Sequence, residues 1–225
     1  IDKLTLMIAT YGHGTENDFV LIFDPKDENS ITTAQTAAIC NRETGIGADG
    51  LIRIIKREEK WFMDYRNADG SIAEMCGNGI RVMARYLVER GHQPEGIFAI
   101  NTRDGIKHLR VPLTDDISVN MGQVTDEDEA ITASVNGQIW NGYNISVGNP
   151  HAVVFVNEMS DIGSLDVAPV VRPRDSYPEG VNVEFAKIID GNEIAMRVFE
   201  RGSGETRSCG TGTCAVALAA TLHTK

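Results

Sequence analysis

Two cysteines stand in the same short pattern, and their chemistry is the most informative feature of the sequence. The two segments are Met75-Cys76-Gly77-Asn78-Gly79 and Ser208-Cys209-Gly210-Thr211-Gly212. An apolar run with helical spacing follows each of them, so the pattern predicts that a helix begins at each Gly-x-Gly. Backbone N–H groups at a glycine-flanked helix start can approach an anion closely, and the helix dipole favours negative charge there. Each cysteine is therefore expected beside an anion-binding site.

Two equivalent thiols suit a symmetric proton transfer. In racemisation or epimerisation, one group removes the proton from a stereocentre and a second group returns a proton to the opposite face. A thiol, with an unperturbed pKa of about 8.5, is a weak base toward such a carbon. Two helix N-termini that converge on the neighbouring carboxylate would stabilise the developing charge, and the same field would lower the pKa of each thiol. We therefore predict that Cys76 and Cys209 are the acid/base pair.

The two halves of the chain repeat one another in the same order of loops, strands and cysteine-led helix. Asn17 falls on Asn149 at an offset of 132 residues, and Cys76 falls on Cys209 at an offset of 133. Such a period indicates a duplicated structural unit. The repeat predicts two domains of like topology, with their equivalent helix starts facing one another across a cleft.

Apolar patterning predicts the elements that would position these residues. In the first half we expect strands at 4–10, 19–23, 51–55 and 61–65, a helix at 33–41, and short antiparallel strands at 97–101, 106–111 and 117–121. The segment Gly12-His13-Gly14 is typical of a turn. We expect the helix at 33–41 to bury Ala34, Ala37, Ala38 and Ile39.

Composition limits the classes of partner and location. The 225-residue chain carries a formal net charge of −11 and has no Lys/Arg cluster, which argues against nucleic-acid binding and favours a small-molecule substrate. No segment is long and apolar enough to span a membrane, and the first residues do not resemble a signal peptide. Four cysteines without a secretory signal indicate reduced thiols. These features predict a cytoplasmic protein.

The residues around both cysteines closely resemble the two signature stretches of the diaminopimelate epimerases. The first stretch is Asn67-Ala68-Asp69-Gly70-Ser71 with Glu74-Met75-Cys76-Gly77-Asn78-Gly79-Ile80-Arg81; the second is Glu200-Arg201-Gly202-Ser203-Gly204-Glu205-Thr206 with Ser208-Cys209-Gly210-Thr211-Gly212. Similar segments also stand at 17–19, 45–49, 148–151 and 180–184. The resemblance implies an isomerase that interconverts LL- and meso-diaminopimelate in lysine and peptidoglycan precursor synthesis. It implies no pyridoxal phosphate or other cofactor, no metal, and a homodimer.

The resemblance also implies a fold and a set of site residues. The fold is α+β: an N-terminal epimerase domain (1–120) and a C-terminal one (121–225), each a mostly antiparallel sheet wrapped around a central helix. Cys76 and Cys209 correspond to the family's acid/base thiols. The expected substrate-binding residues are Asn17, Asn67, Gly77, Asn78, Asn149, Asn182, Glu200, Arg201, Gly210 and Thr211. Glu200 and Arg201 suit the ammonium and carboxylate at the non-reacting end of the substrate.

The sequence departs from the family pattern in two places. Gly50 stands where many members have Gln, so one side-chain contact is absent or is supplied differently. Family members continue beyond the second cysteine-led helix into further strands, so the C-terminal domain is expected to lack its last strands here.

Three alternatives stay open at this point. A proline racemase or hydroxyproline epimerase uses the same two-thiol arrangement, although it typically has His where Asn78 stands. A thiol-based metal or redox module could use Cys209 and Cys214, but five residues of helix turn the two side chains in different directions. Asn149, Asn182, Glu200 and Arg201 could instead be structural, and His151 is expected to be a hydrogen-bonded structural residue.

Overall fold

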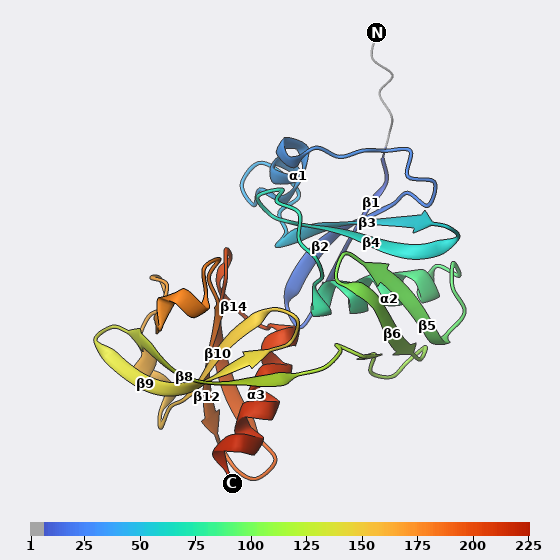
Figure 1. The fold of residues 1–225 in the computed structure, drawn as a ribbon. Helices are drawn as coiled ribbons and strands as arrows, with labels where there is room; N and C mark the ends of the chain where they lie inside the picture. The colour runs from blue at the N-terminus through green and yellow to red at the C-terminus, as the bar shows by residue number, and fades with distance from the viewer. Residues whose placement is uncertain (1–6) are drawn as a thin grey trace. The chain divides into compact units, whose positions relative to one another are not determined.

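The computed structural model describes residues 7–225 and divides into two compact units, Ile1–Asn120 and Met121–Lys225 (Figure 1). Each unit contains one seven-stranded sheet. Unit 1 consists of β1 (Ala9–Gly14), β2 (Asn17–Phe23), α1 (Thr33–Cys40), β3 (Gly50–Arg57), β4 (Lys60–Asn67), α2 (Gly77–Glu89), β5 (Gly96–Thr102), β6 (Gly105–Val111) and β7 (Ser118–Val119). Its strands are hydrogen-bonded in sequence order.

Unit 2 has strand order β11-β8-β9-β10-β12-β13-β14. Its elements are β8 (Thr125–Val135), β9 (Gln138–Ser146), β10 (Pro150–Phe155), β11 (Val170–Arg172), β12 (Asn182–Ile188), β13 (Ile194–Glu200), β14 (Gly204–Thr206) and α3 (Gly210–His223), with 3₁₀ turns at Met159–Ile162 and Arg174–Ser176. Most strand pairs in both sheets are antiparallel; β2/β3, β4/β5 and β10/β12 are parallel. The predicted α+β class with two similar units is confirmed.

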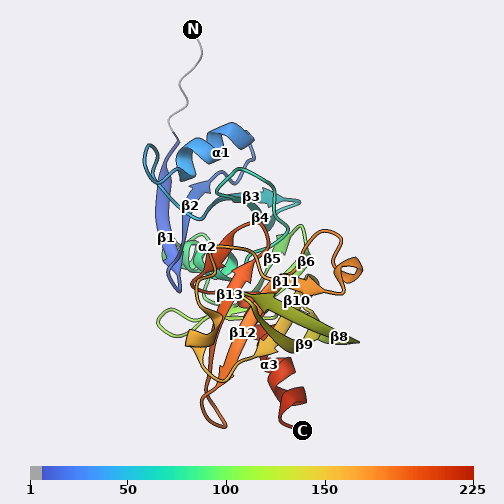
Figure 2. The same ribbon diagram turned by 90° about the vertical axis from the view of Figure 1, so that its left-hand side faces the viewer.

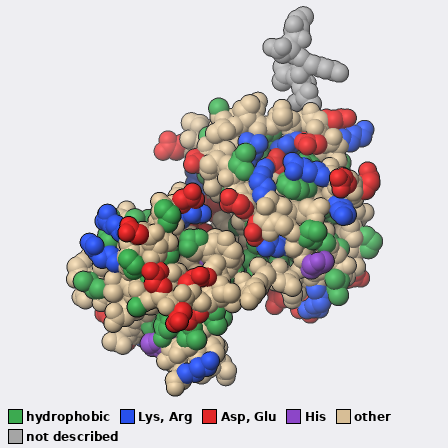
Figure 3. Space-filling view, viewed as in Figure 1, with side chains coloured by type: hydrophobic (Ala, Val, Ile, Leu, Met, Phe, Trp, Pro, Cys, Tyr) green, Lys and Arg blue, Asp and Glu red, His purple; other side chains and the backbone are tan. Residues whose placement is uncertain are grey.

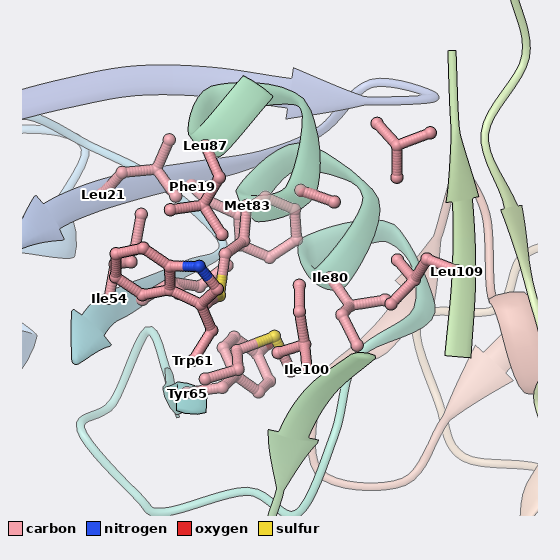
Figure 4. Close-up of a cluster of buried hydrophobic side chains, with 14 of the residues drawn as sticks. Phe19, Leu21, Ile54, Trp61, Tyr65, Ile80, Met83, Leu87, Ile100 and Leu109 are labelled. Atoms are coloured by element: carbon pink, nitrogen blue, oxygen red, sulfur yellow. The ribbon is translucent and has the colours of Figure 1, made fainter. Parts of the chain in front are cut away.

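Helix α2 lies at the centre of unit 1. One face of the helix carries Ile80, Met83 and Leu87, all fully buried. This face packs against β1 to β4, β6 and β7, so the sheet curls around the helix. The shared core also includes Phe19 and Ile54 (Figure 4). Helical spacing predicts a face formed by the apolar residues Ile80, Val82, Met83, Tyr86 and Leu87: three of these are buried, and Val82 and Tyr86 are half-buried against the same core.

The glycines of β1 correct one prediction. Gly12 and Gly14 form no turn: β1 runs through both, and the chain turns at Thr15 and Glu16, which have positive φ. A Cβ on Gly12 or Gly14 would lie 3.1 or 3.2 Å from the side chain of Val82 on α2. The glycines let the helix approach the strand closely. Of the strand expected at 4–10, residues 4–6 lie outside the described residues.

Helix α1 covers the opposite face of β2 and β3 from α2 (Figure 2). The capping box of Thr32 and Gln35 starts the helix. Its buried residues are Thr36 and Cys40. Of the four residues expected to be buried, Ala34 and Ala38 are exposed, so the prediction was wrong for them, while Ala37 and Ile39 are half-buried. An alanine-rich helix of eight residues carries no clear apolar stripe from which the buried face could be read.

The strand register shows the repeat at the level of single residues. In the parallel pair of unit 1, Phe19 lies opposite Gly50; in unit 2, His151 lies opposite Asn182, an offset of 132 at both positions. The next pair is antiparallel, and its hairpin is one residue longer in unit 2: Lys56 pairs with Trp61, and Ile188 pairs with Ile194. This extra residue produces the change from 132 to 133 that the sequence showed.

Candidate active site, in two halves

Both cysteines occupy the N-cap of the helix that their motif begins. Cys76 precedes α2 and Cys209 precedes α3, and each sulfur accepts a hydrogen bond of 3.4 Å from a backbone N–H three residues later. That residue is a glycine in both motifs, and a larger side chain would not fit there. A Cβ added to Gly79 would lie 2.9 Å from the Ile52 side chain, and one added to Gly212 would lie 2.6 Å from the Glu184 side chain. The glycines thus seat each helix start on its sheet, with the first-turn N–H groups directed away from the helix.

In unit 1 the structure brings three of the predicted residues together. The Asn17 side-chain oxygen lies 3.6 Å from Cys76 Sγ and accepts a 3.2 Å hydrogen bond from Asn78 Nδ2. Asn17 is itself held by a carboxylate, because its Nδ2 donates to Asp49 Oδ2 at 2.7 Å. Asn67 lies at the end of β4, where it donates to Ser71 Oγ at 3.0 Å.

The Asp49 carboxylate that holds Asn17 belongs to a charged cluster with Asp18 and Arg42. Arg42 donates to both carboxylate oxygens of Asp18, at 3.0 and 2.8 Å, and to Asp49 Oδ1 at 2.7 Å. Burial alone would raise the pKa of Asp18, but the Arg42 guanidinium, the Tyr11 hydroxyl and the Asp49 backbone N–H hold this pKa well below its usual range. Asp18 and Arg42 therefore both stay ionised at neutral pH.

In unit 2 a different set of side chains surrounds Cys209. Thr211 Oγ1 lies 3.4 Å from Cys209 Sγ and accepts a 3.4 Å hydrogen bond from Asn149 Nδ2. The other end of the Asn149 amide lies 3.0 Å from His151 Nε2, and His151 Nδ1 lies 2.7 Å from Glu184 Oε1. His151 is thus a hydrogen-bonded residue beneath the site, as the sequence analysis expected.

The His151–Glu184 pair marks where the two copies differ most. At an offset of 132, His151 replaces Phe19 and Glu184 replaces Ile52, so a polar pair lies under α3 where an apolar pair lies under α2. Both polar side chains are fully buried. Burial raises the pKa of Glu184 above its usual range, and the His151 ring lowers it in part. Glu184 was not among the site residues predicted from the sequence, although its charge at an otherwise apolar position of the repeat was a detectable signal.

The environment of Cys209 differs from the prediction. The helix field was expected to lower the pKa of both thiols. Instead, burial and then the nearby Glu200 charge raise the pKa of Cys209 well above its ordinary value. Hydrogen bonds from Thr211 and the Gly212 N–H lower this pKa, but their effect is weaker. Cys209 is only 6% exposed. Loss of solvation outweighs the helix N-terminus at this site.

The remaining predicted residues gather at the end of β13. Asn182 Nδ2 donates to the backbone oxygen of Pro150 at 3.2 Å, and its oxygen accepts the Arg201 N–H at 2.9 Å. Asn182 therefore ties Arg201 to the start of β10. Glu200 accepts a hydrogen bond from the Thr206 hydroxyl, and the Arg201 side chain is exposed.

The described residues offer little support for other kinds of site. Within 7–225, no group of three or more His, Cys, Asp or Glu side chains is arranged to hold a metal ion. Cys214 is half-buried and packs with the core under α3. On the face shown in Figure 3, Lys and Arg side chains are interspersed with Asp and Glu. In this same part of the chain, none of the helices is long and apolar enough to cross a membrane.

Comparison with known proteins agrees with the arrangement around the cysteines. The family model of diaminopimelate epimerase matches residues 9–126 and 143–225. The diaminopimelate epimerase of Streptomyces coelicolor is 48% identical over 219 residues, which cover 92% of this chain and 76% of the relative. That of Corynebacterium glutamicum (strain ATCC 13032) is 41% identical over 97% of this chain and 83% of its own length.

Solved structures with much lower identity share the fold. A hydroxyproline epimerase from Agrobacterium vitis, solved with trans-4-hydroxy-L-proline, has a TM-score of 0.66 at 14% identity and covers 97% of this chain and 77% of its own. A PhzC/PhzF protein from Clostridium difficile has a TM-score of 0.67 at 10% identity, covering 98% and 84%. At these identities only the fold is common, whereas the sequence matches extend through both cysteine motifs. The chain therefore belongs to the diaminopimelate epimerase family.

Proposed function

We propose that this chain epimerises LL-diaminopimelate to meso-diaminopimelate with Cys76 and Cys209 as its two acid/base thiols. The observation that carries the mechanism is the equivalent position of both cysteines, each at the N-cap of a helix, where the first-turn N–H groups and the helix dipole favour an anion such as a carboxylate. Residues 1–120 and 121–225 would act as two epimerase domains, each supplying one thiol. Because the chain belongs to the diaminopimelate epimerase family, it is an isomerase that acts on a small molecule.

In the proposed reaction one proton leaves the α-carbon of the substrate, and a second proton is added to the opposite face of the same carbon. The thiolate of one cysteine removes the α-proton, so that the C–H bond breaks, an S–H bond forms and the electron pair spreads into the α-carboxylate. The N–H groups at Gly77 and Asn78, and at Gly210 and Thr211, would stabilise this charge. The thiol of the other cysteine then donates its proton to the opposite face of the carbon. The thiols exchange roles when the reaction runs backwards.

We assign recognition of the remaining groups to polar side chains around each helix start. Asn17 and Asn67 would contribute from unit 1, and Asn149 and Asn182 from unit 2. Glu200 and Arg201 would bind the ammonium and carboxylate of the non-reacting end. The exposed Arg201 side chain and its anchored backbone support this role, since a fork-shaped cation binds a carboxylate with two parallel hydrogen bonds.

Other parts of the proposal follow from the family and from composition. We propose that the enzyme works without a cofactor, in lysine and peptidoglycan precursor synthesis, in the cytoplasm and as a homodimer. A metal or redox role for Cys209 and Cys214 has less support, because Cys214 packs into the core under α3.

The proposed substrate is tested by comparing two amino acids on the same protein. LL-diaminopimelate and L-proline are each incubated with the enzyme without added cofactor, and chiral chromatography measures the isomers formed. We expect meso-diaminopimelate to form while L-proline keeps its configuration, because proline has no second amino-acid end for Glu200 and Arg201. Racemisation of L-proline without turnover of diaminopimelate would contradict the proposal. A Cys76→Ser/Cys209→Ser variant serves as the blank.

A further inference from the structure

A directional chain of hydrogen bonds crosses the helix start in unit 1. The Arg81 guanidinium donates to Asn78 Oδ1. Asn78 Nδ2 donates to Asn17 Oδ1 at 3.2 Å, and Asn17 Nδ2 donates to Asp49 Oδ2 at 2.7 Å. Two amides are thus linked between a cation at one end and a carboxylate at the other.

The two charged ends fix the direction of the whole chain. A guanidinium can only donate hydrogen bonds, and an ionised carboxylate can only accept them. Reversing the Asn17 amide would place its oxygen against the Asp49 carboxylate and its NH₂ against that of Asn78. The orientation of an amide is normally assigned from its hydrogen-bonding partners. Here the partners permit a single orientation.

The fixed orientation places an acceptor beside Cys76. Asn17 Oδ1 lies 3.6 Å from Cys76 Sγ, with the sulfur as donor. A carbonyl oxygen at this position is favourable for S–H and unfavourable for a thiolate. The Gly79 N–H, 3.4 Å from the sulfur, is a contact that opposes this effect. The other titratable or charged groups in this network are Arg42 after α1, Asp18 on β2 and Tyr11 on β1.

The equivalent amide in unit 2 has the opposite direction. Asn149 turns its NH₂ toward Thr211 Oγ1, which lies beside Cys209 Sγ, and its oxygen toward His151. Because Thr211 accepts from Asn149, its own hydroxyl hydrogen is available to the sulfur. Orientation of the asparagine amide is therefore specific to each half.

We propose that Asp49 and Arg81 are positioning residues that lock the Asn17 oxygen toward Cys76 and so hold Cys76 as a protonated thiol in the free enzyme. The inference deepens the proposed function, since it rests on Cys76 being an acid/base group. Cys76 then enters the reaction with a proton to donate. Neither Asp49 nor Arg81 needs to touch the substrate for this effect.

The test frees both amides without changing the net charge. The double variant Asp49→Asn/Arg81→Met removes one negative and one positive charge. Neither end of the hydrogen-bond chain then fixes the orientation of the Asn17 and Asn78 amides. Iodoacetamide alkylation of the Cys76 peptide is followed by mass spectrometry across a pH series. We expect the midpoint of the profile to move to lower pH, with about tenfold faster alkylation below it. An unchanged or higher midpoint would overturn the proposal.

Single variants and an internal control separate orientation from charge. Arg81→Met keeps the Asp49 end and loses a positive charge, so its alkylation should be slower than that of the parent; faster alkylation would contradict the lock. The Cys209 peptide from the same digests should react alike in the parent and double variant, and a parallel change there would show a general loosening and refute a local effect.

A spectroscopic measurement on the parent protein does not depend on how the Asp49 and Arg81 variants fold. The Raman S–H stretching band of Cys76, isolated by subtracting the spectrum of Cys76→Ser, should lie below the frequency of a free thiol, because the S–H donates to Asn17. A band at or above the free-thiol frequency would overturn the proposal. Turnover of diaminopimelate by Cys76→Ser separately tests the proposed function, so the two failures are distinguishable.

Discussion

Replacing either Cys76 or Cys209 by serine should lower epimerase turnover by about 10³-fold, a typical contribution of a positioned acid/base group. A serine hydroxyl cannot be deprotonated near neutrality, so it supplies no base. Serine is also a preferred N-cap residue, and its oxygen can accept the N–H of Gly79 or Gly212 that the sulfur accepts now. The fold should therefore be kept while the chemistry is lost.

Cys214→Ser is the matched control for these variants. It makes the same atomic exchange within α3, on a side chain that packs with the core rather than at the helix start. Its turnover should stay within a few-fold of the parent. Initial rates of meso-diaminopimelate formation and far-UV circular dichroism are measured for all three variants. Turnover near the parental rate in Cys76→Ser or Cys209→Ser, with an intact spectrum, would contradict the two-thiol mechanism.

Arg53→Met should destabilise unit 1 by about 3–5 kcal/mol, the usual cost of breaking a buried ion pair. Arg53 lies on β3 and donates to Asp24 at 2.7 Å and to Asp64 at 3.0 Å. The side chains of all three residues are at least 94% buried. Methionine would leave Asp24 without its cation, while Asp64 would keep its ion pair with Arg103.

Denaturant unfolding measures this loss in unit 1 alone. The fluorescence of Trp61, which is buried in unit 1, is followed in a Trp140→Phe background. Glu59→Gln is the control within unit 1: its pair with Lys56 is exposed and should contribute less than about 1 kcal/mol. A loss in Arg53→Met no larger than in Glu59→Gln would show that the buried network adds no more than a surface pair.

The destabilisation should depend on pH in a defined direction. Burial raises the pKa of Asp24, but Arg53 and the N–H groups of Asn29 and Glu28 outweigh it and hold the pKa below its ordinary value. A carboxyl group whose pKa is lowered on folding stabilises the protein above its unfolded pKa, of about 3.9, and loses this contribution as the pH falls. The difference between parent and Arg53→Met should therefore be full at neutral pH and shrink below about pH 4.

The sequence predicted much of the fold because its signals were local. Apolar residues at helical spacing after Cys76 defined the buried face of α2, and the repeat located its counterpart after Cys209. The segment Gly12-His13-Gly14 was misread because glycine marks both turns and close packing. Only the position of Val82 on α2 decides between these two meanings, and that contact joins residues far apart in the chain.

The sequence predicted which residues form the candidate site better than it predicted their protonation and the orientation of their side chains. The motif and the repeat located both cysteines and the asparagines beside them. They did not reveal that burial raises the pKa of Cys209, because burial depends on how the whole unit packs. Asp49 and Arg81 likewise gain their effect from the orientation of amides held between them, and orientation is a property of the folded network.

Epimerisation in deuterium oxide tests the central claim most directly. LL-diaminopimelate is converted to a small extent, and mass spectrometry and proton NMR locate deuterium in the meso product and in the remaining substrate. With two thiols on opposite faces, the product should carry solvent deuterium at the inverted carbon while the remaining LL substrate keeps its hydrogen. Retention of the original hydrogen in the product, or equal early labelling of both pools, would contradict the two-thiol account.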